Sequence, residues 1–380
     1  MSQKVLTKNR NGKLKVCIIS NTNSAHVQRW ANILISKGCK ISIVTNSIDE
    51  GYIEDAEIIE SLSKYSKHKI VRLMNEFGRA LFIRYTLSRL KPDVVHIHSF
   101  DYIHPFMIFL ISIFTGGFNK LVVSTWGTDV ITSLKGDTTF LGDLSKKLLL
   151  RKARCITASS KYLASVTSRL APPDRKIHVI PFGIDCVLFS RISRKRTGPL
   201  RIGFVKHLKP VYGPDYLLRA FSIVSKKRSD IKLILVGEGA MKADLVKLSK
   251  DLGIDRNVSF IGYVPNKQIP AVLKEIDILV MPSILETFGV AALEAQSMEI
   301  PVIASNSGGV PEVVVDKVTG FLVEPKDYKG LAQAIQKLID QPGLREKMGK
   351  AGRRFVLKNY RIEDNADKLI SLYENLKNGD

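Results

Sequence analysis

The chain has 380 residues, of which 45% are hydrophobic and 25% are charged. This balance is typical of a globular protein and excludes a long disordered tract, and the length favours two domains over a single core. The four cysteines are scattered without a paired or metal-binding spacing, which favours buried thiols in a reducing compartment over a disulfide framework.

The net charge of +22 is unevenly distributed. Residues 1–200 contain 31 Lys and Arg against 14 Asp and Glu, whereas residues 201–380 contain 27 against 22. The basic residues do not alternate with aromatic ones and match no nucleic-acid-binding module, so no nucleic-acid partner is expected. An anionic membrane surface is the preferred partner of the first half. Charge that serves only solubility is the alternative.

Neither a signal peptide nor a membrane span is expected. The N-terminus is polar and basic, and no apolar segment follows it. The longest apolar run, 106–118, contains two glycines and is shorter than the roughly 20 residues that a spanning helix needs. We expect a buried or interfacial helix there, and a cytoplasmic protein that is peripheral at the inner face of the cell membrane.

Short β-branched runs alternate with helix-length segments along the whole chain, which is typical of parallel α/β units. Strands are expected at 15–20, 40–45, 93–98, 121–125, 155–159 and 178–181, and then at 201–205, 232–236, 258–261, 278–281, 302–304 and 321–323. The fold class is therefore α/β, with two doubly wound sheets whose ligands bind outside the carboxyl ends of the strands.

The sequence between the two sets of strands has the composition of a linker. Residues 191–199 are polar and rich in residues that break regular structure. We therefore expect an N-terminal domain over 1–190, a linker over 191–199 and a C-terminal domain over 200–358.

Two histidines lie near the end of the strand expected at 93–98. His96 and His98 share one face of that strand, and Asp101 follows it. These residue types bind metals, but no further ligand follows at a suitable spacing. No metal site is expected.

A turn that opens a helix follows the strand expected at 278–281. The segment 283–294 reads Ser-Ile-Leu-Glu-Thr-Phe-Gly-Val-Ala-Ala-Leu-Glu. The first amides of a helix lack intrahelical acceptors, so the backbone N–H groups around Thr287, Phe288 and Gly289 suit a phosphate.

Two glutamates flank this turn. Glu286 precedes it, and Glu294 lies more than one turn into the helix. Carboxylates accept hydrogen bonds from hydroxyls, so a ligand with a sugar on one side and a ribose on the other is expected between them. The alternative is that glutamates are common near helix starts because of the helix dipole alone.

Five further motifs accompany this segment. They are Pro-Phe-Gly-Ile-Asp at 181–185, Gly-Glu-Gly-Ala-Met at 237–241, Gly-Tyr-Val-Pro at 262–265, Ser-Gly-Gly-Val-Pro-Glu-Val-Val at 307–314 and Thr-Gly-Phe-Leu-Val at 319–323. In their order and spacing they resemble the retaining glycosyltransferases of the GT4 type (group 1), which have the GT-B fold. The resemblance covers nearly the whole chain and is strongest over 177–325.

The resemblance implies two Rossmann-like domains that face a central cleft. The C-terminal domain would hold the donor, a nucleotide diphosphate sugar such as a UDP-sugar or GDP-sugar, and the N-terminal domain would hold the acceptor. The last helix, 359–380, would cross back to the N-terminal domain. No cofactor or metal is required.

Roles at the donor site follow from the same resemblance. Glu286 resembles the glutamate that contacts the transferred sugar, and Glu294 the one that binds the donor ribose. The turn at Thr287, Phe288 and Gly289 matches the segment whose amides meet the phosphates or the sugar.

Two further parts of the donor site are implied. Val264 lies in the loop where the base would rest against backbone. Gly308 and Gly309 precede Pro311, so a second helix start is expected to face the cleft. A tight turn between strand and helix is the alternative for the two glycines.

The chain departs from the family pattern where two cations usually neutralise the diphosphate. His207 occupies the place of the usual arginine and Tyr212 that of the usual lysine. The charge must then come from Lys206 or Lys209, because a leaving diphosphate needs a fixed cation nearby. The sequence does not distinguish the two lysines.

The acceptor half resembles the family less closely. His98 ends a strand and is expected either to point into the cleft or to have a structural role. Trp126 stands where many relatives have a histidine near the reacting sugar. Asp129 is expected either to meet acceptor or sugar hydroxyls or to cap the helix that follows.

The resemblance implies an enzyme, a hexosyltransferase-like glycosyltransferase of class EC 2.4. The acceptor would be a glycan or lipid-linked hydroxyl in cell-surface polysaccharide or glycolipid synthesis. No enzymic nucleophile stands out, which agrees with a front-face reaction in which the departing phosphate accepts the acceptor proton. The alternative is a non-catalytic nucleotide-sugar-binding protein derived from such a transferase.

Overall fold

The computed structural model describes residues 13–45, 53, 55–60, 69–100, 106, 108, 110, 120–190 and 198–379. These residues form two compact units. The first unit falls within 1–158, 164–180 and 366–380, and the second comprises 159–163 and 181–365. Residues 181–190 thus belong to the second unit, which also extends past the expected residue 358, and the end of the chain, 366–380, belongs to the first unit.

Several expectations concern residues outside this description. Asp101 is one of them, and most of the apolar run 106–118 and of the linker 191–199 lies there too. Among the described residues, no helix is both long enough and apolar enough to cross a membrane.

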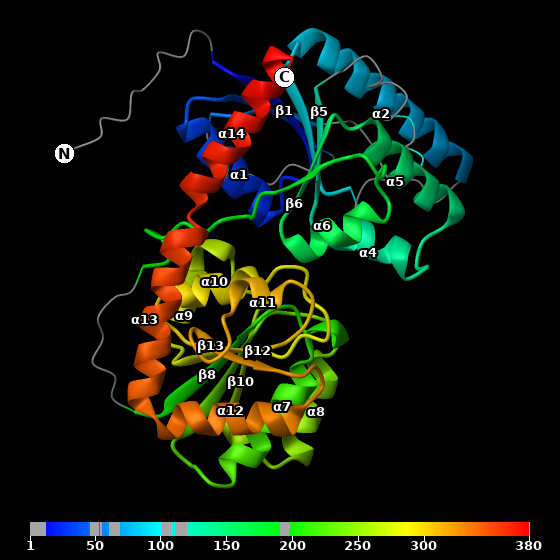
Figure 1. Ribbon diagram of the computed structural model, residues 1–380. Coiled ribbons are helices and arrows are strands. Elements are labelled where there is room, and N and C mark those ends of the chain that lie inside the picture. The colour runs from blue at the N-terminus through cyan, green and yellow to red at the C-terminus, as the bar shows by residue number, and fades with distance from the viewer. Residues whose placement is uncertain are drawn as a thin grey trace, which may run out of the picture. The chain divides into compact units, whose positions relative to one another are not determined.

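The first unit contains a parallel sheet with the strand order β3-β2-β1-β4-β5-β6-β7 (Figure 1). Its strands are β1 (Lys15–Ile19), β2 (Lys40–Thr45), β3 (Glu57–Glu60), β4 (Val94–His98), β5 (Leu121–Thr125), β6 (Cys155–Ala158) and β7 (Ile177–Val179). The chain reverses its direction of winding between β1 and β4, and this topological switch point is where doubly wound sheets bind ligands.

Helices cover both faces of this sheet. They are α1 (Ala25–Ser36), α2 (Lys69–Leu90), α4 (Thr128–Leu134), α5 (Phe140–Lys152), α6 (Lys161–Ser168) and α14 (Ile362–Asn378). The first residues of α6, 161–163, and of α14, 362–365, belong to the second unit. Helices α1 and α14 lie on one face, and α2 and α5 lie on the other (Figure 1). Helix α1 buries Val27, Trp30 and Leu34, whose spacing forms one apolar stripe, and the chain turns at Gly38 with φ of 89°.

The second unit repeats the pattern with the order β10-β9-β8-β11-β12-β13, again with parallel pairs. Its strands are β8 (Leu200–Val205), β9 (Ile231–Val236), β10 (Val258–Gly262), β11 (Ile278–Met281), β12 (Val302–Ser305) and β13 (Gly320–Val323). Its switch point lies between β8 and β11.

The helices of the second unit form two layers. They are α7 (Pro214–Ser225), α8 (Lys242–Asp251), α9 (Ile269–Leu273), α10 (Val290–Ser297), α11 (Val310–Val313), α12 (Tyr328–Asp340) and α13 (Pro342–Asn359), with short 3-10 turns at Pro210–Tyr212, Asp255–Asn257 and Asn266–Gln268. Helices α7, α8 and α12 cover one face of the sheet, and α10 and α13 pack together on the other (Figure 1). The core between the first layer and the sheet is apolar and includes Phe204, Phe221 and Ile335.

Every expected strand is present, with ends that differ by at most two residues. The additional strand is β3, a short edge strand that pairs with β2. Its sequence is Glu-Ile-Ile-Glu, and its side chains are half-buried or exposed. This sequence has a charged residue on each side of only two isoleucines, and so lacks the longer β-branched run of an interior strand. The strand β3 was therefore not predicted from the sequence.

Candidate functional site

A largely buried pair of charged side chains lies at the switch point of the second unit. Strands β8 and β11 are neighbours in the sheet, and the loops 206–213 and 282–289 leave their carboxyl ends. This is the position at which an open parallel sheet offers a crevice to a ligand.

Close backbone contacts fix these two loops to each other. Gly213 has φ of 62°, and a Cβ atom added to it would lie 2.3 Å from the carbonyl oxygen of Pro282. The N–H of Ile284 donates to the carbonyl of Val211 at 2.8 Å, and the Ser307 hydroxyl donates to the Ile284 carbonyl at 2.7 Å. The loops are therefore held in one relative position by backbone and not only by side chains.

Lys206 and Glu286 form an ion pair across the two loops. Lys206 Nζ lies 2.5 Å from Glu286 Oε2, and the two side chains are only 20% and 9% exposed. Lys206 Nζ also lies 4.8 Å from the centre of the Tyr212 ring. Each residue directly follows or closely follows one strand of the switch point, so the sheet topology brings together residues that are 80 positions apart.

The pKa of Lys206 is raised above its usual value. Burial by itself lowers this pKa, because it disfavours the charged ammonium group. Glu286 and Tyr212 raise the pKa by more than burial lowers it, and Glu294 raises it further. Lys206 is therefore a fixed, partly desolvated cation.

Glu294 belongs to the same electrostatic group. It lies on α10 and is buried, and it helps to raise the pKa of Lys206. The two glutamates that the sequence singled out are thus both buried around one lysine.

The Thr287-Phe288-Gly289 turn begins α10, as expected. Gly289 has φ of 105° and lies directly before the helix. The Phe288 side chain is buried and packs against the rings of Phe182 and Tyr360, at 5.9 and 5.8 Å between ring centres. The Phe288 ring therefore belongs to the core and is not available to a ligand.

The Thr287 carbonyl forms a hydrogen bond within the protein. It accepts a hydrogen bond from the Ser160 hydroxyl at 2.7 Å. Ser160 belongs to the segment 159–163 of the same unit. This bond fixes the orientation of the peptide group that follows Thr287.

Gly308 and Gly309 pack directly on the backbone of the same turn. A Cβ atom at Gly308 would lie 2.1 Å from the Glu286 carbonyl oxygen, and one at Gly309 would lie 2.2 Å from that of Thr287. The Gly309 N–H donates to the Glu286 carbonyl at 2.9 Å. The geometry favours the tight-turn alternative for both glycines, since the backbone contact itself requires them and the Gly309 amide is used within the protein.

The other expected donor-site residues are less enclosed. Lys209 and His207 are exposed, and His207 Nδ1 lies 3.4 Å from the Glu238 carbonyl. Val264 is half-buried beside Gly262, which has φ of 86°. The structure places Lys206 at Glu286 and leaves Lys209 exposed.

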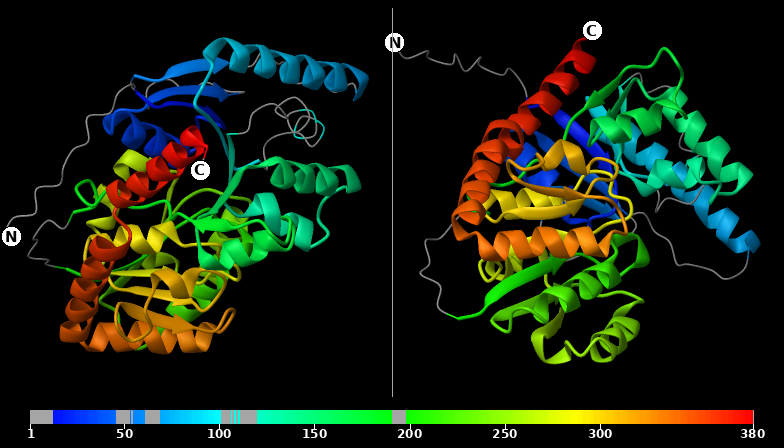
Figure 2. Two further views of the ribbon diagram at one scale, coloured as in Figure 1. Left: turned by 45° about the horizontal axis from the view of Figure 1, so that its top comes forward. Right: turned by 60° about the horizontal axis from the view of Figure 1, so that its bottom comes forward.

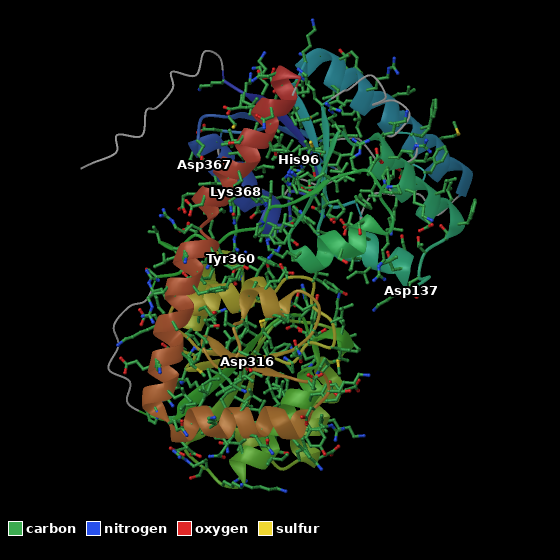
Figure 3. The ribbon with its side chains drawn as sticks, in the orientation of Figure 1. His96, Asp137, Asp316, Tyr360, Asp367 and Lys368 are labelled. Atoms are coloured by element: carbon green, nitrogen blue, oxygen red, sulfur yellow. The ribbon has the colours of Figure 1, made fainter. Side chains whose placement is uncertain are left out.

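His96 and His98 form a buried polar network at the end of β4. His98 Nε2 lies 3.0 Å from His96 Nδ1, and His96 also contacts the Tyr373 hydroxyl at 2.5 Å and the Ser124 hydroxyl at 2.7 Å. His96 lies beside α14, which carries Tyr373 (Figure 3). The two histidines share one strand face, as the strand period predicted.

Burial keeps both rings neutral. It lowers the pKa of His98 to about 3. Burial, and secondly the neighbouring His98, lower the pKa of His96 well below its usual value. No group of three His, Cys, Asp or Glu side chains that could hold a metal ion occurs among the described residues.

Asp129 acts within the protein as a capping residue. Its carboxylate accepts hydrogen bonds from the N–H of Trp126, at 3.1 and 3.0 Å, and from the N–H of Gly127 at 2.7 Å. Asp129 is buried in the first turn of α4. These contacts favour the capping alternative over contact with a ligand.

The turn held by Asp129 positions an aromatic side chain over His98. The Trp126 ring lies 5.3 Å from the His98 ring and 5.8 Å from the His26 ring, measured between centres. Trp126 thus occupies the end of β5 next to the end of β4, where an acceptor was expected.

Two contributors to these sites were missed from the sequence. The Glu312 carboxylate accepts from the N–H groups of Lys161 and Tyr162, each at 2.8 Å, and so caps the start of α6. Tyr373 reaches His96 from 277 positions away. Glu312 lies within the Gly-Gly-Val-Pro-Glu motif, which was a usable signal, but no local pattern indicates Tyr373.

Comparison with known proteins gives matches over most of the chain. The family model described as Glycosyl transferases group 1 matches residues 188–355, and the one described as Glycosyl transferase 4-like matches residues 15–160. The N-acetyl-alpha-D-glucosaminyl L-malate synthase of Bacillus anthracis is 30% identical over 296 residues, which cover 75% of this chain and 74% of the relative. The glycogen synthase of Mycobacterium tuberculosis is 27% identical over 298 residues, which cover 76% and 70%.

Solved structures of similar fold cover almost the entire chain. Sucrose-phosphate synthase from Thermosynechococcus elongatus has a TM-score of 0.82 at 18% identity, covering 97% of this chain and 100% of that chain. Anabaena HepE in complex with UDP-glucose has a TM-score of 0.76 at 16% identity, covering 94% and 99%. The expected two-domain GT-B fold is thereby confirmed.

Proposed function

Because this chain belongs to the group 1 glycosyltransferases of the GT4 type, we propose that it moves a sugar from a nucleotide diphosphate sugar to a hydroxyl acceptor with retention of configuration. The observation that carries the proposal is the buried Lys206–Glu286 pair at the switch point of the second unit. A carboxylate for sugar hydroxyls and a cation for phosphate oxygens are the two groups that such a donor requires at the bond that breaks.

The donor is a UDP-sugar or a GDP-sugar. Anabaena HepE has been solved with UDP and with UDP-glucose, and a relative from Mycolicibacterium smegmatis, 28% identical over 273 residues, is described as GDP-mannose-dependent. Glu294 binds the donor ribose, and Val264 lies in the loop that receives the base. The amide groups at the start of α10 face the diphosphate.

The reaction takes place on one face of the sugar. The bond between the anomeric carbon and the phosphate oxygen breaks, and the acceptor oxygen forms its bond from the same side. The acceptor proton passes to the departing phosphate. Lys206 stabilises the charge that grows on this phosphate, and Glu286 holds the sugar hydroxyls so that the anomeric carbon stays in place.

The acceptor is a glycan or a lipid-linked hydroxyl at the inner face of the cell membrane, in cell-surface polysaccharide or glycolipid synthesis. Support comes from the basic first half of the chain, since basic residues are attracted to anionic lipid. Trp126 offers an aromatic surface, and sugar rings pack on such surfaces.

Thermal unfolding in the presence of a panel of UDP-, GDP- and ADP-sugars identifies the donor. A ligand that binds only the folded protein at about 100 times its Kd stabilises it by about 2.7 kcal/mol. One member of the panel should raise the melting temperature by several degrees, and the others should not.

Two glutamate variants then test the roles of the site. Glu286→Gln should lower turnover by about 100-fold with little change in KM, because it removes an interaction with the reacting sugar. Glu294→Gln should mainly raise the donor KM, by about tenfold. Glu346→Gln, which breaks a surface pair with Lys350 on α13, is the matched control and should match the wild type.

Hydrolysis of the matched donor separates the transferase from a protein that only binds sugar nucleotides. A transferase slowly releases nucleotide diphosphate to water when no acceptor is present. Full activity of both site variants, or donor binding without any release, would refute the proposal.

A further inference from the structure

The outer side of helix α2 is apolar. Met74, Phe77, Leu81 and Tyr85 recur at intervals of three and four residues, which places them in one stripe along the helix. All four are exposed, and the exposed fraction of Met74 is 69%. Single exposed apolar residues are ordinary, but a continuous stripe of large ones marks an interaction surface.

The inner side of the same helix carries its ion pair. Glu76 and Arg79 lie 3.1 Å apart, and their side chains are only 8% and 13% exposed. They share the inner side with Ala80, Ile83 and Leu87. The inner side of α2 is thus filled by apolar residues and one ion pair, and the large apolar residues of the outer stripe face away from this core.

Helix α5 repeats this arrangement in its first turns. Phe140 is 85% exposed, and Leu141 and Leu144 are exposed beside it. Further along the helix, Arg151 and Lys152 are exposed. The outer side of α5 is therefore apolar at its beginning and basic at its end.

Both helices lie on the same face of the first unit's sheet. They lie on the opposite face from α14 in each view (Figures 1 and 2). Basic residues border the apolar stripe of α2 as well, since Arg84 and Arg89 are exposed. The acidic side chains of residues 74–90 and of α5 are Glu76, which is buried, and Asp143, which is paired with Lys147 at 2.6 Å.

We propose that this surface docks on an anionic lipid bilayer. The α2/α5 face is defined by the apolar residues Met74, Phe77, Leu81, Tyr85, Phe140 and Leu144 and by the basic residues Arg84, Arg89, Arg151 and Lys152. The apolar side chains enter the boundary between headgroups and acyl chains, and the basic ones meet lipid phosphates.

The pattern of charge distinguishes this occupant from others. A second copy of this chain would set the basic borders of two such faces against each other, which is repulsive. A lipid surface supplies apolar and anionic groups together. The inference rests on the proposed function, because a lipid-linked acceptor requires an enzyme at the membrane. Lipid binding itself is measured without a donor and without any assay of activity.

Vesicle flotation of the full chain tests the proposal. Vesicles of phosphatidylcholine with about 30% phosphatidylglycerol should carry the protein, and vesicles of phosphatidylcholine alone should carry at least tenfold less. The double variant Phe77→Ser with Leu81→Ser should weaken binding at least tenfold. Arg151→Gln with Lys152→Gln should weaken it about fivefold for each charge removed, and the residual binding should depend less on salt.

Matched substitutions in the second unit serve as controls. Val318→Ser removes an exposed apolar side chain there, and Lys247→Gln with Lys329→Gln removes two exposed charges. All of these should bind vesicles as the wild type does. Phe140→Ser with Leu144→Ser tests the other helix independently, should the α2 variant fold poorly.

Three results would overturn the proposal. The first is that the wild-type protein does not float with anionic vesicles. The second is that the apolar variants of both helices float like the wild type. The third is that the protein self-associates instead of floating and that the same variants abolish this self-association. Donor-induced thermal stabilisation of each variant should remain that of the wild type. Loss of lipid binding with intact donor binding thus separates this inference from the proposed function.

Discussion

The two sheets of this protein have the same strand order around their switch points. The groups at those points differ in charge. In the second unit, the ends of β8 and β11 carry the Lys206–Glu286 ion pair. In the first unit, the described residues at the ends of β1 and β4 include uncharged groups in their place: the Ser20 hydroxyl donates to the His98 carbonyl at 3.0 Å, and the His98 ring is neutral. One topology therefore supports two different kinds of site.

This difference matches what each half of a transfer reaction requires. A diphosphate needs a fixed cation at the bond that breaks, and a partly desolvated lysine provides one. A hydroxyl acceptor carries no charge and needs surfaces and hydrogen-bonding groups instead. The contrast between a charged and a neutral switch point is thus a functional hypothesis, and each prediction below would break or sharpen it.

The largest expected effect is on the charged side. Lys206→Met should lower turnover by about 100- to 1,000-fold, because the leaving phosphate loses its cation while Glu286 stays buried beside it. Steady-state kinetics with the matched donor give the size of the loss. Lys206→Arg should retain more activity than the methionine variant, since it keeps the charge.

Lys209→Met is the control, because Lys209 is exposed and lies only three residues further along the same loop. It should stay within about twofold of the wild type. If Lys209→Met lost turnover and Lys206→Met kept it, the cation would have been assigned to the wrong lysine and the charged switch point would lose its meaning.

The second prediction concerns how the charged site is held. Gly308→Ala places a Cβ atom 2.1 Å from the Glu286 carbonyl oxygen, at a residue whose φ of 59° disfavours side chains. The free energy of unfolding should fall by about 2–4 kcal/mol. Donor-induced stabilisation should fall as well, because the Glu286 backbone must move. Thermal unfolding with and without donor measures both.

Gly343→Ala is the matched glycine variant. Gly343 lies in α13, and an added Cβ atom there has no atom within 4 Å. It should leave donor binding unchanged and stabilise the protein by up to about 1 kcal/mol. Wild-type donor binding in Gly308→Ala would mean that the turn adapts freely and that close backbone packing does not position Glu286.

The strands of both units and the main motif of the second unit could be predicted from the sequence, but the contacts that form each site could not. The strands and the segment 283–294 were predictable because a buried parallel strand and a helix start each have a local pattern. Which lysine pairs with Glu286 was not predictable, since it depends on how the loop 206–213 folds against the loop that follows β11. Local patterns thus indicate elements and motifs but not the contacts between them.

The first unit shows the same limit more clearly. Tyr373 reaches His96 from the far end of the chain, and Asp129 bonds to its own turn although its residue type equally suits a ligand. The Phe288 amide was expected to face a ligand, and the ring of the same residue packs on Phe182 and Tyr360, which no local pattern indicated. Each of these outcomes is decided by tertiary packing, which a single sequence does not encode in any short segment.

The third prediction tests the neutrality of the first unit's site. Burial lowers the pKa of His98 from 6.5 to about 3, so below pH 6.5 the unfolded chain binds a proton that the folded chain does not. The neutral His98 ring therefore favours the folded state fully above pH 6.5, and this contribution to the free energy of unfolding is lost as the pH falls toward 3. Between pH 7 and pH 5, His98 alone should lower the free energy of unfolding by about 2 kcal/mol.

Urea unfolding followed by tryptophan fluorescence measures this effect in the correct unit, because both tryptophans, Trp30 and Trp126, belong to the first unit. His98→Gln should make the unfolding free energy less dependent on pH by about one proton. His207→Gln, at an exposed position in the second unit, should keep the wild-type dependence. An unchanged dependence in His98→Gln would show that the ring is not held neutral by burial.

The smallest expected effect decides what Asp129 does. Its carboxylate accepts from the N–H groups of Trp126 and Gly127, and an asparagine would direct an amide donor toward the same groups. Asp129→Asn should therefore lower the free energy of unfolding by about 1–2 kcal/mol, with acceptor KM nearly unchanged. The exposed Asp137 (Figure 3) gives the control, and Asp137→Asn should change neither quantity. If Asp129→Asn instead raised the acceptor KM at wild-type stability, a charged group would take part at the first switch point, and the contrast between the two units would fail there.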